Sequence, residues 1–112
     1  MGRSICWRQT PGLALLCLAL ATAHAADTGR RSDAELGNLV LQDCGSCHGM
    51  TLKGGLGPPL RPDNLERLPV EAISAIIREG VPDTAMPPWK PLLTPEETDW
   101  ISRQLKSGAL LH

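Results

Sequence analysis

Cys44-Gly45-Ser46-Cys47-His48 is the most informative stretch of this 112-residue chain. Two thiols three positions apart, followed at once by an imidazole, form the attachment pattern of a c-type haem. The thiols would become thioethers on the two vinyl groups, and His48 would bind the iron as an axial ligand. One helical turn brings Cys44, Cys47 and His48 to the same side of the backbone. The stretch therefore predicts one covalently attached haem c.

The N-terminal residues 1–25 are typical of a cleaved secretory signal peptide. Arg3 and Arg8 supply its positive charge, residues 13–21 form a compact apolar run, and residues 23–25 (Ala-His-Ala) are a small-x-small cleavage site. An uncleaved membrane anchor is the alternative, but the apolar run is shorter than the roughly 20 residues that a bilayer requires. The pattern therefore predicts export to the periplasm, with no membrane anchor.

Cleavage would leave a flexible N-terminal lead at residues 26–31 and one domain at residues 32–112. Removal of the signal leaves 9 basic and 12 acidic residues, a net charge of −3, which argues against a nucleic-acid binder. The chain contains no Phe and no Tyr. A domain this small has a marginal core unless something reinforces it. A haem would provide that reinforcement as a large, flat apolar body.

A zinc half-site and a thioredoxin-like redox pair are the alternatives for Cys44 and Cys47. A structural zinc site needs four ligands, whereas the mature chain would keep two cysteines and two distant histidines. A thioredoxin-like pair follows a strand in an α/β pattern, and no alternating apolar run predicts a strand here. A disulfide between the two would close a very small loop and add little stability. Attachment of a haem explains the pair better, because it also uses His48.

Three main helices are predicted in the mature chain. Ser32 and Glu35 form a capping box, so the first helix should run from about Asp33 into the haem motif. The second lies between Pro69 and Gly80 and carries one apolar stripe. The third begins after a second capping box, Thr94 with Glu97, and stops near Gly108.

The stretches 49–67 and 81–93 are rich in glycine and proline and are expected to be irregular. Loops this long in so small a domain normally serve a function. The predicted fold is therefore all-α, a small domain of three main helices and two long loops wrapped around one covalent haem.

Met86 is the best candidate for the second axial ligand. His24 would leave with the signal, Met50 is only two residues from His48, and His112 ends the chain. Met86 follows His48 by 38 residues, in a loop stiffened by three prolines. A thioether is a soft, uncharged donor that raises the reduction potential of haem iron. A core-filling methionine is the alternative reading.

Together these features resemble the class I single-haem cytochromes c. The resemblance rests on the haem motif, on Gly57-Pro58-Pro59-Leu60, on Ala85-Met86-Pro87 and on a final helix that bears a tryptophan. It covers essentially the whole mature chain. It implies a small cytochrome c fold and an electron-transfer protein, not an enzyme.

The resemblance also implies roles for particular residues. Pro58 would accept a hydrogen bond from Nδ1 of His48 through its carbonyl, and Leu60 would pack on the haem face. Gly37 and Trp100 would mark the crossing of the first and last helices, with the glycine admitting the indole ring. Trp89 would either donate its indole N–H to a haem propionate or pack as an apolar group.

More narrowly, residues 43–58 and 86–89 are similar to a small periplasmic cytochrome of denitrifying bacteria, made together with the cytochrome cd-type nitrite reductase. The similarity implies either a monomeric one-electron carrier to that reductase or an accessory factor in maturation of its d-type haem. An enzyme or a gas sensor with a labile Met86 is less favoured. Neither an additional histidine nor a carboxylate cluster accompanies the iron site in the sequence.

Overall fold

The computed structural model describes residues 29–111, and within them the protein contains helices and no strand. The predicted signal peptide, residues 26–28 of the predicted N-terminal lead, and His112 lie outside the described residues. The all-α prediction is confirmed. No helix within residues 29–111 combines the length and the apolar character needed to cross a bilayer.

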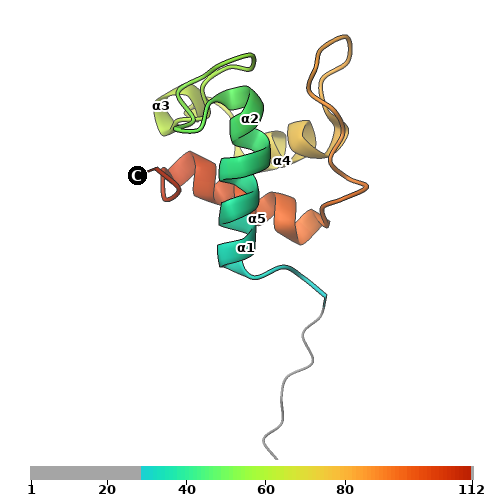
Figure 1. Ribbon diagram of the computed structural model, residues 1–112. Coiled ribbons are helices and arrows are strands. Elements are labelled where there is room, and N and C mark those ends of the chain that lie inside the picture. The colour runs from blue at the N-terminus through green and yellow to red at the C-terminus, as the bar shows by residue number, and fades with distance from the viewer. Residues whose placement is uncertain (1–28, 112) are drawn as a thin grey trace, which may run out of the picture.

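The N-terminal helical segment is continuous from Asp33 to His48 (Figure 1). It comprises α1 (Asp33–Leu39), the π-helix η1 (Val40–Cys44) and α2 (Gly45–His48). The predicted capping box is confirmed, since the Ser32 hydroxyl accepts from the Glu35 amide and the Glu35 carboxylate accepts from the Ser32 amide. At η1 the backbone widens, and the Gly45 amide donates to the Val40 carbonyl. This wide turn leads directly into the haem motif.

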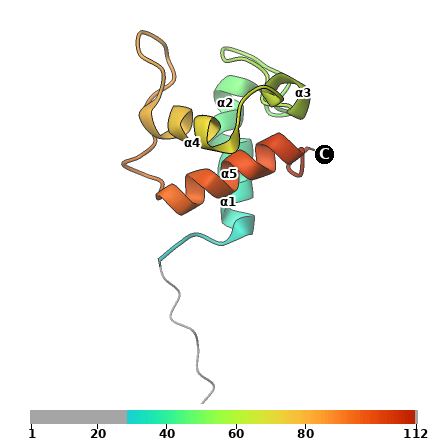
Figure 2. The same ribbon diagram turned by 180° about the vertical axis from the view of Figure 1, so that it is seen from behind.

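The other two predicted helices are α4 (Val70–Glu79) and α5 (Pro95–Ser107), which pack closely on each other (Figure 2). Thr94 caps α5 in the predicted capping box with Glu97, and Gly108 ends it in the left-handed conformation. Where α4 meets α5, the buried Ser74 hydroxyl donates to Thr98 Oγ1 at 3.0 Å. Polar groups in this interface are therefore paired rather than left unsatisfied.

A short helix, α3 (Pro62–Leu65), corrects the prediction that residues 49–67 are wholly irregular. Pro62 occupies a first-turn position, where its missing amide costs nothing. At the other end, Lys106 Nζ from α5 donates to the carbonyls of Leu65, Glu66 and Leu68 at 3.1, 2.9 and 2.6 Å. The Leu65 carbonyl also accepts from the Leu68 amide at 3.0 Å, and Lys106 adds a donor at this helix end, where carbonyls lack partners within the helix. A contact from 40 residues away therefore supports this turn.

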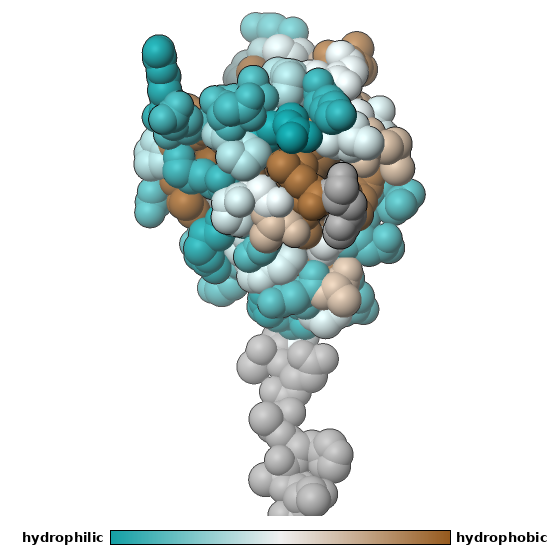
Figure 3. Space-filling view, turned by 90° about the vertical axis from the view of Figure 1, so that its left-hand side faces the viewer, coloured by the Kyte–Doolittle hydropathy of each residue, from teal (hydrophilic) through white to brown (hydrophobic). Residues whose placement is uncertain are grey.

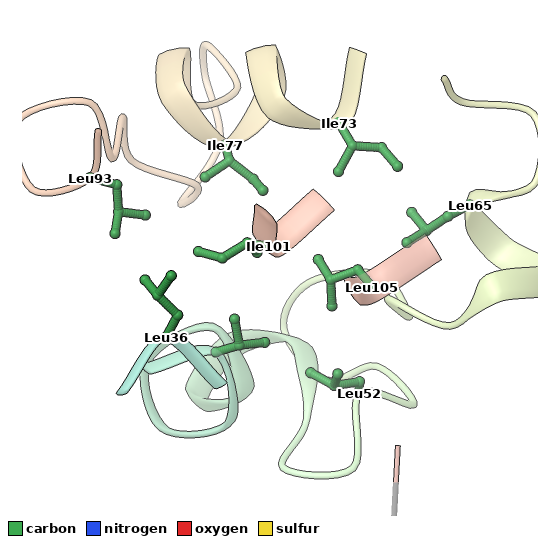
Figure 4. Packing of buried hydrophobic residues seen from close by; sticks show 9 residues of the cluster. Leu36, Leu52, Leu65, Ile73, Ile77, Leu93, Ile101 and Leu105 are labelled. Carbon is green, nitrogen blue, oxygen red and sulfur yellow. The ribbon is translucent and has the colours of Figure 1, made fainter. Parts of the chain in front are cut away.

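The hydrophobic core lies between the N-terminal segment, α4 and α5 (Figure 4). Ile101 and Leu105 of α5 lie between the isoleucines of α4 on one side and Leu36 on the other. Burial of such side chains contributes on the order of 2 kcal/mol each. The buried apolar residues are Leu36, Val40, Leu52, Leu65, Ile73, Ile77, Leu93, Ile101 and Leu105.

Leu110, not Trp100, closes the space beside Gly37. A Cβ atom built at Gly37 would have the Leu110 Cδ2 atom at 3.4 Å as its neighbour, and no atom of Trp100 within 4 Å. The helices α1 and α5 do contact each other, but the predicted placement of the Trp100 ring at Gly37 is not found. The segment after α5 folds back onto α1 instead. Figure 3 shows this face of the molecule, where apolar groups lie exposed between hydrophilic ones.

Arg31 contacts the folded domain through Glu97 of α5. Its amide donates to Glu97 Oε1 at 3.0 Å, and its guanidinium lies 3.0 Å from Glu97 Oε2. Arg30 also bonds to Asp33 at 2.8 Å. The flexible lead at residues 26–31 stays a prediction, although Arg31 within it contacts α5 through Glu97. The partner carboxylate lies 66 positions away from Arg31, so local sequence does not reveal this contact.

Candidate haem-binding site

A cavity of about 610 Å³ opens between α2, α4 and the loop that follows α4. Its volume lies within the range of roughly 300–1,000 Å³ that is usual for ligand sites. Its walls are predominantly apolar. All seven predicted site residues line it: Cys44, Cys47, His48, Pro58, Leu60, Met86 and Trp89.

Cys44 and Cys47 lie on one wall of the cavity as free, partly buried thiols. Burial raises the pKa of the Cys44 thiol to about 11, and the neighbouring Asp43 carboxylate adds to the rise. Redox-active cysteines of the thioredoxin type have a lowered pKa instead. The environment of Cys44 therefore argues against a thioredoxin-like pair.

The imidazole of His48 is held in one orientation. The side chain is 9% exposed, and its Nδ1 atom lies 2.7 Å from the Pro58 carbonyl oxygen. Because a carbonyl can only accept, Nδ1 carries the proton, and Nε2 keeps its lone pair. Such a bond fixes the tautomer and the ring orientation of a metal-binding histidine. His48 can thus bind iron through Nε2.

The loop at residues 49–57 folds back over the end of α2. The Gly57 amide donates to the Cys47 carbonyl and the Gly54 amide to the His48 carbonyl, each at 2.8 Å. These bonds satisfy carbonyls that the helix end leaves free. They also place the Pro58 carbonyl next to the His48 imidazole.

Gly57 approaches the imidazole so closely that no side chain fits there. A Cβ atom at this position would lie 2.7 Å from His48 Cε1 and 2.8 Å from Nδ1. Sequence reasoning identified Gly57 only as part of a motif and missed this contact. The predicted bond from Pro58 to Nδ1 could have indicated this contact. A residue whose carbonyl bonds Nδ1 also places the preceding residue, Gly57, against the ring.

Met86 lies in the loop that borders the cavity after α4, and its side chain is partly buried. Trp89 follows it, anchored by its amide, which donates to the Ile77 carbonyl of α4 at 3.1 Å. The structure thus brings a thioether into the same cavity as the thiols and the imidazole. Imidazole and thioether together form the ligand set of haem iron in cytochromes c.

The cavity fits a haem in a further respect. Leu56, Ile76 and Val81 are 79%, 39% and 40% exposed, and all three line the cavity. A flat apolar group in the cavity would cover part of this surface. Among residues 29–111, no group of three or more histidine, cysteine or carboxylate side chains could hold a metal ion by itself. The donor set therefore suits a haem better than a bare metal ion.

Comparison with known proteins agrees with this geometry. The chain matches the protein family described as "Cytochrome C oxidase, cbb3-type, subunit III" over residues 31–103. It is 48% identical over 94 residues to "Cytochrome c55X" of Paracoccus denitrificans (strain Pd 1222), a match that covers 83% of this chain and 91% of the relative.

Two solved structures are also similar. A structure named "c-type cytochrome NirC" superimposes with a TM-score of 0.69 at 46% identity, covering 70% of this chain and 93% of the other. A second, named "Dihydro-heme d1 dehydrogenase NirN in complex with DHE", gives a TM-score of 0.59 at 33% identity. That match covers 63% of this chain but only 16% of the other.

Proposed function

Because the chain belongs to the c-type cytochromes, in the family of the cytochrome c55X proteins, we propose that it is a periplasmic carrier of single electrons in denitrification. One observation above all supports this function. The helix end that bears Cys44, Cys47 and His48 shares one apolar cavity with Met86. The haem supplies an iron that alternates between ferrous and ferric states.

Each site residue then has a role. Cys44 and Cys47 would hold the haem through thioethers, while Nε2 of His48 and the sulfur of Met86 would bind its iron. Pro58 holds the His48 ring through its carbonyl, at 2.7 Å from Nδ1. Leu60 and Trp89 line the cavity wall and would pack against the haem. With both axial positions occupied by protein, electron transfer is favoured over binding of small ligands.

Met86→Ala tests the axial assignment. The variant should lose the red-edge charge-transfer band of the oxidised protein completely, because that band arises from the bond between sulfur and iron. Its reduction potential should also fall, since a thioether stabilises ferrous iron. Met50→Ala is the matched control, because Met50 is 56% exposed and does not line the cavity. A band that survives in the Met86 variant would refute the assignment.

We propose the cytochrome cd-type nitrite reductase as the electron acceptor. The support comes from the names of the similar proteins, NirC and a dihydro-haem d1 dehydrogenase that contains a region like this chain. Apart from the residues assigned to the haem, the cavity is lined mainly by apolar side chains, with Asp43, Asn64 and Thr84 among its polar ones. A carrier that delivers electrons to a larger enzyme fits this arrangement.

Stopped-flow mixing of the reduced protein with oxidised nitrite reductase tests this partner. We expect oxidation with a second-order rate constant of about 10⁵–10⁷ M⁻¹s⁻¹, the range for association of two specific protein surfaces. Absence of oxidation would reject the reductase as acceptor. Reduction of the oxidised protein by the dehydrogenase acting on dihydro-haem d1 would instead favour the alternative, a role in maturation of the d-type haem.

A further inference from the structure

The loop that carries Met86 is closed by hydrogen bonds of its own. The Met86 amide donates to Thr84 Oγ1 at 3.2 Å, and the Thr84 hydroxyl donates in turn to the Val81 carbonyl at 2.7 Å. The Met86 carbonyl accepts from the Val81 amide at 3.1 Å. Both backbone polar groups of Met86 are therefore held, although the loop as a whole is exposed. Figure 1 shows this loop as a narrow excursion after α4.

Gly80 closes the base of the same loop. Its φ is +68°, a conformation that residues with a side chain rarely adopt. A Cβ atom at Gly80 would lie 2.7 Å from the Met86 carbonyl oxygen and 2.8 Å from the Pro88 nitrogen. The end of α4 and the residues around Met86 thus meet backbone to backbone. Only glycine permits this contact.

The two residues after Met86 restrict the loop further. Pro87 and Pro88 have φ confined near −65°, so the backbone on that side of Met86 has little freedom. On its other side, Thr84 holds the amide. The side chain of Met86 is then the part that remains free to adjust within the cavity.

We propose that Thr84 and Gly80 are positioning residues for Met86. Their contacts with Met86, here called the clasp, keep the thioether at the iron and keep external ligands away from it. The inference rests on the proposed function, in which Met86 is an axial ligand. It goes further by assigning ligand retention to two residues outside the haem motif. The Thr84 hydroxyl fixes the loop from within, and Gly80 allows the loop base to close.

Thr84→Val in the holoprotein tests the hydroxyl, because valine keeps the shape and removes both hydrogen bonds. We expect the reduced variant to bind carbon monoxide roughly three to ten times faster than the wild type, the range expected from the loss of a hydrogen bond. The charge-transfer band of the oxidised variant should also weaken. Thr84→Ser should restore both properties. Thr51→Val, on the exposed loop after α2, is the matched control and should change neither.

Gly80→Ala provides an independent variant with the same readout. It should weaken the band at temperatures where far-UV circular dichroism shows that the helices remain folded. Wild-type behaviour of both Thr84→Val and Gly80→Ala would overturn the proposal that these residues position Met86. That outcome is distinct from failure of the proposed function, in which the wild-type protein itself lacks the band or Met86→Ala leaves it unchanged.

Discussion

Gly57→Ala is expected to destabilise the folded holoprotein by about 3 kcal/mol, the upper end of the usual cost of overpacking. The added Cβ atom would lie 2.7 Å from the His48 ring, well inside van der Waals contact. The ring cannot move away freely, because its Nδ1 atom is bonded to the next residue, Pro58, at 2.7 Å. Either the ring tilts or the hydrogen bond breaks. Both would alter the orientation of the imidazole that is proposed to bind the iron.

Two measurements separate these effects. Denaturant unfolding reports the loss of stability, and paramagnetic NMR shifts of the His48 ring protons report its orientation. Gly37→Ala is the matched control, since its Cβ would meet Leu110 at 3.4 Å, an ordinary contact. Alanine is the better helix former, so this control should be stabilised by up to ~1 kcal/mol. Equal stability of the two variants would show that the contact between Gly57 and the imidazole is not tight.

Glu97→Gln is expected to lower the free energy of unfolding by about 2–3 kcal/mol, because it leaves partly buried donors with an imperfect acceptor. The Glu97 side chain is 1% exposed, and its carboxylate accepts from the amides of Thr94 and Arg31, each at 3.0 Å. The Arg31 guanidinium completes the arrangement at 3.0 Å. Glu96→Gln is the control, since Glu96 is exposed on the same turn of α5.

The same carboxylate makes stability depend on pH. Burial alone would raise the pKa of Glu97, but the backbone bonds from Thr94 and Arg31 and the Arg31 guanidinium outweigh burial and lower it. The unfolded chain therefore binds this proton more readily than the folded one. The stabilisation is complete above the ordinary pKa of 4.5 and is lost as the pH falls through the folded-state value.

Unfolding titrations between neutral pH and acid test this dependence. The wild type should lose stability on acidification more steeply than Glu97→Gln, which has no proton to bind at this position. Parallel curves for the two proteins would show that Glu97 does not contribute the dependence. Glu96→Gln should follow the wild type.

Features that depend on neighbouring residues could be predicted from the sequence. The capping boxes of Ser32 with Glu35 and Thr94 with Glu97 form within one turn, so residue types and spacing suffice. The haem motif is equally local. The all-α architecture followed from these signals together with the apolar stripe of α4.

Features that depend on distant segments could not be predicted. Arg31 meets Glu97 across 66 positions, Lys106 supports α3 across about 40, and Leu110 rather than Trp100 reaches Gly37. Spacing along the chain says nothing about such contacts. The close approaches at Gly57 and Gly80 belong to the same class, because they depend on how a loop returns to a helix.

The π-helix at Val40–Cys44 changes the direction in which the side chains after it point around the axis of the N-terminal segment. Each residue of an α-helix turns the chain by about 100°, so in a regular helix His48 would point roughly 120° away from Leu36, twelve residues earlier. The π-helical turn contains one extra residue, so every residue after it is rotated back by about 100° around the helix axis. The imidazole then faces the same side as Leu36 and Val40, and all three are buried. The five-residue motif supplies the two thiols and the imidazole, but the turn before it determines the direction in which they point.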